Sequence, residues 1–260
     1  MKKKNKWLTS PVFLVIVFAA AVLLLSIGSI GGARAALTYY SDSYASQLEM
    51  QDIGVSLLEN GEKIASRDYK TETADGTWEE TTGELLSHML EESDGTLQLG
   101  RKYTESLSVQ NSGTIGSYVR VTIYKYWLDE DGNKIRNIDP SVIDLHLVNL
   151  TSQDSGEQCW IEDTAAETAE RTVLYYNKML PSTESTPEFS DTLCIDSDVS
   201  THIKQEKDDN GVITDVYEYN GQRFVVEATV DAVQDHNARA AILSAWGIKV
   251  NVDDGKLSLQ

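Results

Sequence analysis

The amino-acid sequence predicts an all-β fold, a sandwich or barrel built from short strands. Dipeptides with Asn or Asp before Gly recur along the chain, and such pairs supply the positive φ angles that tight hairpins need. The stretches between them are rich in Val, Ile, Thr and Tyr, which favour strands. The dipeptides are Asn60-Gly61, Asp75-Gly76, Asp94-Gly95, Asp131-Gly132, Asn210-Gly211, Asn220-Gly221 and Asp254-Gly255.

Residues 118–127 form the clearest predicted strand. Val119, Val121 and Ile123 fall on one face of it, and polar residues fall on the other. The same alternation marks strands at residues 106–110 and 224–232. Shorter strands are predicted at residues 53–58, 142–148, 158–161, 172–176 and 192–195.

Two short helices are predicted beside the strands. Thr82 can cap a helix whose apolar stripe would be Leu85, Leu86, Met89 and Leu90. Asp235 or Asn237 can cap a second helix over residues 238–246, with the side chains of Ala241, Ile242, Ala245 and Trp246 directed inward. Both stripes are interpreted as core packing.

Residues 1–35 have the pattern of an export signal. Lys2, Lys3, Lys4 and Lys6 precede an apolar run over residues 12–25, and Ala33-Arg34-Ala35 places small residues where a signal peptidase reads them. Cleavage is expected between Ala35 and Ala36, which leaves residues 36–260 as a single secreted domain. The alternative is an uncleaved anchor over residues 11–33, since about 20 apolar residues span a bilayer.

The composition argues against some partners. Residues 1–35 hold five of the 22 Lys and Arg residues and none of the 41 Asp and Glu residues, so residues 36–260 carry a net charge of −24. Such a surface repels nucleic acid and anionic lipid. We therefore expect no nucleic-acid partner, and contact with the membrane only through the signal segment before its cleavage.

The two cysteines leave two alternatives open. Cys159 and Cys194 could form one disulfide outside the cell, or they could be buried thiols. The absence of a Cys-x-x-Cys pair argues against a redox motif or a zinc knuckle.

Catalytic and metal-binding motifs are not found in the sequence. His88, His146, His202 and His236 are scattered, and neither His-Glu-x-x-His nor Gly-x-Ser-x-Gly occurs, so no enzyme and no cofactor are predicted. The acidic run from Asp129 to Asn133 is interpreted as a hairpin turn, because Pro140 stands where a calcium loop would need its twelfth-position Glu. Weak calcium binding by clustered surface carboxylates stays open.

Four stretches together resemble the TasA/camelysin-type exported proteins of Gram-positive bacteria. They are Ala-Leu-Thr-Tyr-Tyr-Ser-Asp (36–42) continuing to residues 53–61, the segments 109–113 and 118–121, the segment 175–180 with Ser185-Thr186, and the segment 230–234 with Asn237 and Trp246. The resemblance implies a jelly-roll-like two-sheet sandwich, an extracellular matrix or surface role, and a signal peptidase of the SipW type as partner. The cysteines, the longer middle and the high acidity depart from the family. The protease activity in the camelysin name is not carried over, because its residues are not visible in this chain.

In fibre-forming relatives the segment after the cut is donated to the next subunit as a strand, which here would be residues 36–47. Leu37, Tyr39, Tyr40 and Tyr44 are the expected anchors of that strand. The resulting hypothesis is a secreted, non-enzymatic subunit of biofilm-matrix fibres, or a fibre-associated surface protein. The alternatives are a monomeric surface module that binds glycan, host protein or calcium, and a hydrolase of unfamiliar type.

Overall fold

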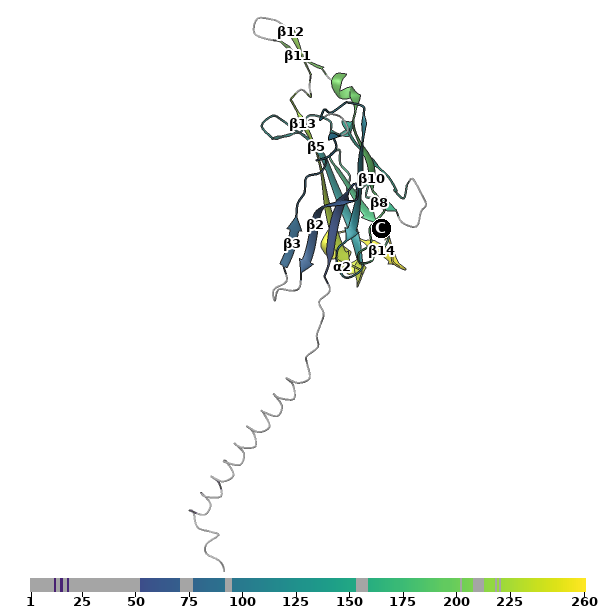
Figure 1. Ribbon diagram of the computed structural model, residues 1–260. Coiled ribbons are helices and arrows are strands. Elements are labelled where there is room, and N and C mark those ends of the chain that lie inside the picture. Colours follow the sequence, from purple (N-terminus) through teal and green to yellow (C-terminus); the bar gives the residue numbers. More distant parts are fainter. Residues whose placement is uncertain are drawn as a thin grey trace, which may run out of the picture. The chain divides into compact units, whose positions relative to one another are not determined.

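The computed structural model describes residues 52–70, 77–91, 95–152, 159–201, 203–207, 213–217, 219 and 221–260, together with the single positions 12, 15 and 18. Residues 50–260 form one compact unit, and residues 1–49 form a separate one. The compact unit is an all-β sandwich in which two antiparallel sheets face each other (Figure 1). The predicted fold class is therefore confirmed.

The six-stranded sheet has the strand order β3-β2-β1-β4-β10-β7. Its strands pair antiparallel throughout. They are β1 (Gly54–Glu59), β2 (Glu62–Lys70), β3 (Thr77–Thr81), β4 (Lys102–Asn111), β7 (Ile143–Leu147) and β10 (Ser190–Ile195).

The five-stranded sheet has the order β13-β5-β9-β8, and β6 also pairs with β5. After β4 the chain crosses repeatedly between the two sheets, as in jelly-roll-like sandwiches. The strands are β5 (Ser117–Leu128), β6 (Lys134–Ile135), β8 (Trp160–Glu162), β9 (Arg171–Tyr176) and β13 (Arg223–Gln234).

The main core lies between the two sheets and follows the alternation of the sequence. In β5 the side chains of Val119, Val121 and Ile123 are buried, and in β4 Leu107 and Val109 are buried with them. Burying an aliphatic side chain of this size contributes about 1.5–3 kcal/mol, so these inward rows supply much of the stability of the sandwich.

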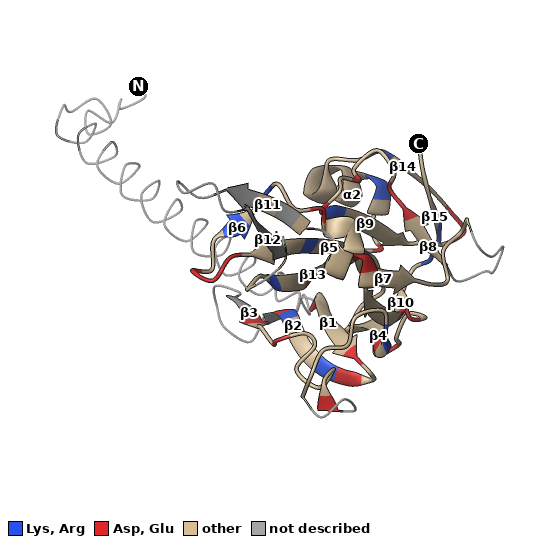
Figure 2. Cartoon of the chain, turned by 90° about the horizontal axis from the view of Figure 1, so that it is seen from above, with Lys and Arg blue, Asp and Glu red and all other residues tan. Residues whose placement is uncertain are grey.

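A second, smaller core covers the outer face of the five-stranded sheet. Helix α2 (Ala238–Trp246) and the hairpin of β14 (Val250–Asp253) and β15 (Lys256–Leu259) form a third layer there (Figure 2). Ile242 of α2 is fully buried in this layer, and Tyr118 and Tyr175 of the sheet pack in the same cluster. The remaining elements of the described residues are the hairpin of β11 (Ile203–Lys207) and β12 (Ile213–Tyr217) and two 3-10 turns, η3 (Pro140–Val142) and η4 (Ser197–Thr201).

Two of the predicted Asn-Gly and Asp-Gly turns close tight hairpins. Asn60 and Gly61 join β1 to β2 with φ angles of 51° and 86°, and Asp254 and Gly255 join β14 to β15 with φ angles of 50° and 75°. Positive φ at both central positions is the type I′ geometry, which matches the twist of paired strands.

The helix predicted after Thr82 is wrong. Residues 85–90 form turns, and Leu86 has a φ of +67°, which an α-helix does not accommodate. The Leu86 N–H instead donates to Oε1 of Glu59 at 2.6 Å, while Leu85, Leu86 and Met89 still pack against the core. Three of the four apolar side chains of the predicted stripe therefore contact the core although the helix does not form.

The second predicted helix is confirmed as α2, with two differences in detail. Asn237 precedes the helix in a left-handed conformation, and its side chain makes no capping hydrogen bond. Ala245 was expected to point inward but is exposed, whereas Ile242 is buried as expected. The buried stripe of the helix is therefore narrower than the sequence predicts.

Candidate functional site

The outermost strand of the five-stranded sheet, β13, has a long edge without a partner strand in the described part of the chain. All twelve of its residues pair with β5 on one side, from Arg223 opposite Leu128 to Gln234 opposite Ser117. On the other side, called here the β13 edge, no described strand is hydrogen-bonded to it. A row of backbone N–H and C=O groups at such an edge is a template for another strand.

The edges of the other outer strands are shorter or already occupied. Strand β8 has three residues, and its outer side is occupied because Trp160 N donates to Asn149 O and Thr151 N donates to Trp160 O, both at 2.8 Å. Strands β3 and β7 have five residues each. Among the described strands, β13 therefore presents the longest edge.

The six-stranded sheet extends past β13 and leaves part of its inner face uncovered. Strand β1 lies against β13, and β2 and β3 lie beyond it. Ala65 and Arg67 of β2 are the cross-strand partners of the inward-facing Leu57 and Val55, so they too face inward. Arg67 is nevertheless exposed, because no described strand of the opposite sheet covers it.

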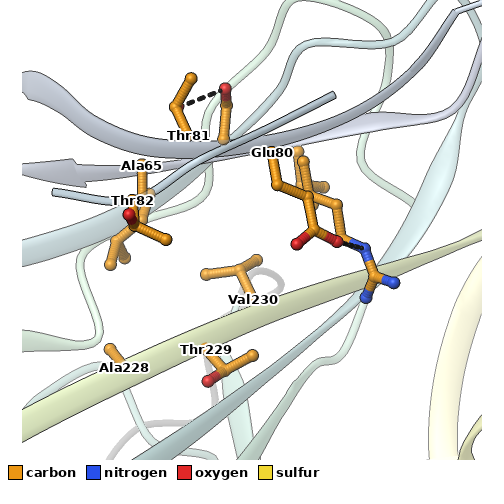
Figure 3. A pocket seen from close by; sticks show the side chains of 11 residues that line it. Ala65, Glu80, Thr81, Thr82, Ala228, Thr229 and Val230 are labelled. Carbon is orange, nitrogen blue, oxygen red and sulfur yellow. Dashed lines mark hydrogen bonds and ion pairs between the residues drawn. The ribbon is translucent and has the colours of Figure 1, made fainter. Parts of the chain in front are cut away.

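The uncovered face and the β13 edge together form a groove. The groove is defined by Ala65, Arg67, Glu80 and Thr82 on one side and by Ala228 and Val230 of β13 on the other. In Figure 3 the side chains of Ala65, Thr82 and Val230 project into the same space from the two sheets. The walls are mainly small and apolar near β13, which suits the inward side chains of an added strand.

A chain of ion pairs crosses the groove. Arg67 Nε lies 2.9 Å from Glu80 Oε1 on its own sheet, and Arg67 Nη1 lies 3.2 Å from Asp231 Oδ1 on β13. Asp231 Oδ2 also accepts from Nη2 and Nε of Arg120, at 2.7 and 3.2 Å. The Arg120 guanidinium lies in turn 5.4 Å from the ring centroid of Trp246. Arg67 is therefore a charged bridge between the two sheets.

Arg67 borders two hollows, of which the first is the groove itself and the second is a neighbouring hollow. The first hollow, of about 200 Å³, lies toward Leu57, Ala65 and Ala228. The second hollow, of about 180 Å³, lies toward Ile53, Ala232 and Trp246, and both hollows include Arg67 in their lining. Each far exceeds the roughly 10–15 Å³ of such space that one water needs, so each has room for atoms of an incoming side chain.

A pair of carboxyl groups is buried inside the sandwich, apart from the groove. Glu59 and Glu105 are 5% and 1% exposed and share the inner face with Leu107. Desolvation, followed by the hydrogen bond with Glu59, raises the pKa of Glu105 to about 9. The carboxyl group of Glu105 thus keeps its proton at neutral pH. Sequence reasoning missed this pair, although Glu105 stands in phase with Leu107 and Val109.

The acidic run at Asp129 is a turn, as predicted. Asp129 Oδ1 accepts the backbone N–H of Asn133 at 2.7 Å, and that hydrogen bond lowers the pKa of Asp129. Within the described residues, no group of three or more His, Cys, Asp or Glu side chains is arranged to hold a metal ion. Calcium binding therefore stays a prediction.

The two cysteines are thiols and are not joined by a disulfide. Cys159 lies directly before β8 in one sheet, and Cys194 lies in β10 in the other. Burial, together with the nearby carboxylates of Asp144 and Asp196, raises the pKa of Cys194. Of the two alternatives that the sequence left open, the structure has the thiols.

The residues predicted for export and strand donation lie outside the described residues. They are Ala33, Ala35 and Ala36 at the expected cut and Leu37, Tyr39, Tyr40 and Tyr44 as expected anchors. Among the described residues, no helix is long and apolar enough to cross a membrane. The structure thus describes the groove beside β13, and these predicted residues stay untested.

Comparison with known proteins gives no relative for this chain: no family model, no curated protein and no solved structure matches it. A functional proposal for this chain therefore rests on its sequence, its fold and its groove.

Proposed function

We propose that the chain is a secreted subunit of extracellular fibres, and that its groove receives residues 36–47 of a neighbouring copy as an added strand. The observation that carries the proposal is the long β13 edge beside the uncovered inner face of β2. A strand in this position would extend the five-stranded sheet and cover that face. Both effects stabilise the complex, through main-chain hydrogen bonds and through burial of alternate side chains.

The lengths and compositions of the two parts agree. The segment 36–47 and strand β13 each have twelve residues. They contain Leu37 and three tyrosines, which have strand propensity and large apolar surfaces, and they contain no Pro or Gly. Each main-chain hydrogen bond gained at the edge contributes about 1 kcal/mol net, so several of them make a durable contact.

The geometry of the contact leads to a filament. The donated segment precedes β1 in the chain, and the groove is lined by residues of β1, β2, β3 and β13, so each copy carries one donor segment and one acceptor groove. A head-to-tail contact of this kind forms an open chain when its rotation does not close into a ring. Removal of residues 1–35 by a signal peptidase of the SipW type would free the donor only after export.

Deletion of residues 36–47 tests the proposal. The truncated chain keeps its groove and its fold, so we expect a monomer in place of filaments in electron micrographs. Because that monomer can accept a strand but cannot donate one, a small fraction of it added to the intact chain should cap filaments and shorten them. Filaments of normal length from the truncated chain alone would contradict the proposal.

Two other results would favour the alternatives. Monomers of the intact chain whose melting temperature rises with calcium would indicate a surface-binding module. Chelator-sensitive cleavage of casein by the pure chain would indicate a hydrolase.

A further inference from the structure

We propose that Arg67 is the receptor for one specific side chain of the donated strand, the carboxylate of Asp42 from a neighbouring copy. The flanking side chains of Tyr40 and Tyr44 would then occupy the two hollows on either side of Arg67. This inference rests on the proposed function, and it adds the register and the charge pair that select the donor.

Arg67 lies where an added strand must pass. Its side chain borders both hollows, so a strand that fills them crosses the guanidinium. An inserted strand would remove water from this group, and a desolvated charge needs a partner of opposite sign. Arg67 already has Glu80 and Asp231 as partners, and a carboxylate on the incoming segment would add a complementary charge at the point where the strand covers the guanidinium.

The sequence of the segment supplies one candidate. Asp42 is the only charged residue among residues 36–47. In a strand, residues i−2 and i+2 project on the same face as residue i, about 6.6 Å away on either side. Tyr40 and Tyr44 stand at these two positions, which matches the placement of Arg67 on the border of two hollows. The second hollow is also lined by Arg120 and Asp231, which can form hydrogen bonds with the hydroxyl end of a tyrosine.

The ion pairs of Arg67 allow this exchange. Asp231 is held by Arg120 through two contacts of 2.7 and 3.2 Å in addition to its 3.2 Å contact with Arg67. If Arg67 turns from Asp231 to Asp42, Asp231 keeps the Arg120 guanidinium as its partner. Glu80 of β3 stays paired with Arg67 of β2. When Arg67 exchanges Asp231 for Asp42, each of these charged groups therefore still has a partner of opposite sign.

The register follows from the pairing. A shift of one residue turns every side chain of a strand to the other face. With Asp42 inward, Tyr40 and Tyr44 face the groove, and Leu37 and Tyr39 face away from it. Tyr40 and Tyr44 are therefore the anchors, and Leu37 and Tyr39 are dispensable for seating the strand in the groove.

Charge reversal on each side of the contact tests the pair, with the chain beginning at Ala36. Arg67→Glu alone and Asp42→Arg alone should each reduce the filament yield in a sedimentation assay at least tenfold, because like charges then meet at every junction. An equimolar mixture of the two variants should restore filaments. In an alternating filament of the two variants, the donor and acceptor side chains at every junction again carry opposite charges.

The controls and outcomes separate this inference from the proposed function. Arg239→Glu, on the exposed side of α2, should leave the yield unchanged. Restoration in the mixture also shows that both variants fold. If truncation of residues 36–47 abolishes filaments but the reversals have no effect, or the mixture stays dispersed, the Arg67–Asp42 pair is wrong and strand donation stands. If the intact chain forms no filaments, both are wrong.

Discussion

The carboxyl group of Glu105 is hydrogen-bonded to that of Glu59 inside the sandwich, where both side chains are buried. Glu59 also accepts the backbone N–H of Leu86, so the pair ties the turn at residues 85–90 to β1. Two carboxylates this close cannot both ionise without a large cost, since the medium around them is of low polarity.

The pair predicts that stability falls as pH rises. The pKa of Glu105 is about 9 in the folded chain and near 4.5 in the unfolded chain, so the folded state binds more protons between these values. The free energy of unfolding is therefore greatest below about pH 4.5 with respect to this group and declines as pH rises toward about 9. The slope is at most about 1.4 kcal/mol per pH unit for one proton.

Glu105→Gln should flatten this decline, because the amide stays neutral at every pH. Urea unfolding at a series of pH values from about 5 to about 9 measures the effect, and Glu130→Gln, at an exposed position, is the matched control. Equal slopes for Glu105→Gln and the unmodified chain would show that the buried pair does not hold a proton.

A bulky side chain in the groove should prevent filament assembly and leave the fold of the subunit unchanged. Ala65→Trp fills the first hollow from the side of β2, so we expect filament yield to fall at least tenfold with little change in melting temperature. Sedimentation and circular dichroism measure the two quantities. Leu243→Trp, on the exposed side of α2, is the control for added apolar surface, and an equal loss there would point to nonspecific aggregation.

The main core should be sensitive to lost volume. Leu107 is fully buried between the sheets, so Leu107→Ala should lower the free energy of unfolding by about 2–5 kcal/mol. Leu243 is 47% exposed, and Leu243→Ala should cost under about 1 kcal/mol. Chemical denaturation measures both variants, and similar losses would contradict the placement of Leu107.

The two thiols should have no part in covalent stability. A thiol reagent added in denaturant should titrate both Cys159 and Cys194, and a reducing agent should leave the melting temperature unchanged. A drop of several degrees on reduction would instead reveal a disulfide, since such a crosslink contributes about 2–4 kcal/mol.

Sequence reasoning located β5 and β13 because apolar and polar residues alternate along most of each strand. Residues 118–127 became β5 (Ser117–Leu128), and residues 224–232 became β13 (Arg223–Gln234). Strands β2 and β3 were not predicted, because one face of each is uncovered and its residues, such as Arg67 and Glu80, do not alternate with apolar ones. Of the strands that line the groove, β13 was predicted from the sequence and β2 and β3 were not.

The candidate site shows the same limit. The sequence offered a donor segment but no acceptor, because the groove joins residues of β2, β3 and β13 that are distant along the chain. The helix predicted after Thr82 failed for a related reason: the carboxylate of Glu59 binds Leu86 N–H and stabilises a turn that local propensity does not indicate. Both the groove and the turn at residues 85–90 thus depend on contacts between residues that are distant in the sequence.

Amide hydrogen exchange of β13 (Arg223–Gln234) is the most direct test of the central claim, that the β13 edge receives residues 36–47 of another copy. Exchange is compared between filaments of the intact chain and the chain without residues 36–47. The account predicts that the amides facing the β13 edge exchange much more slowly in the filaments, while those bonded to β5 are protected in both. Unchanged exchange along β13, with slowing at β3 or β7 instead, would contradict it.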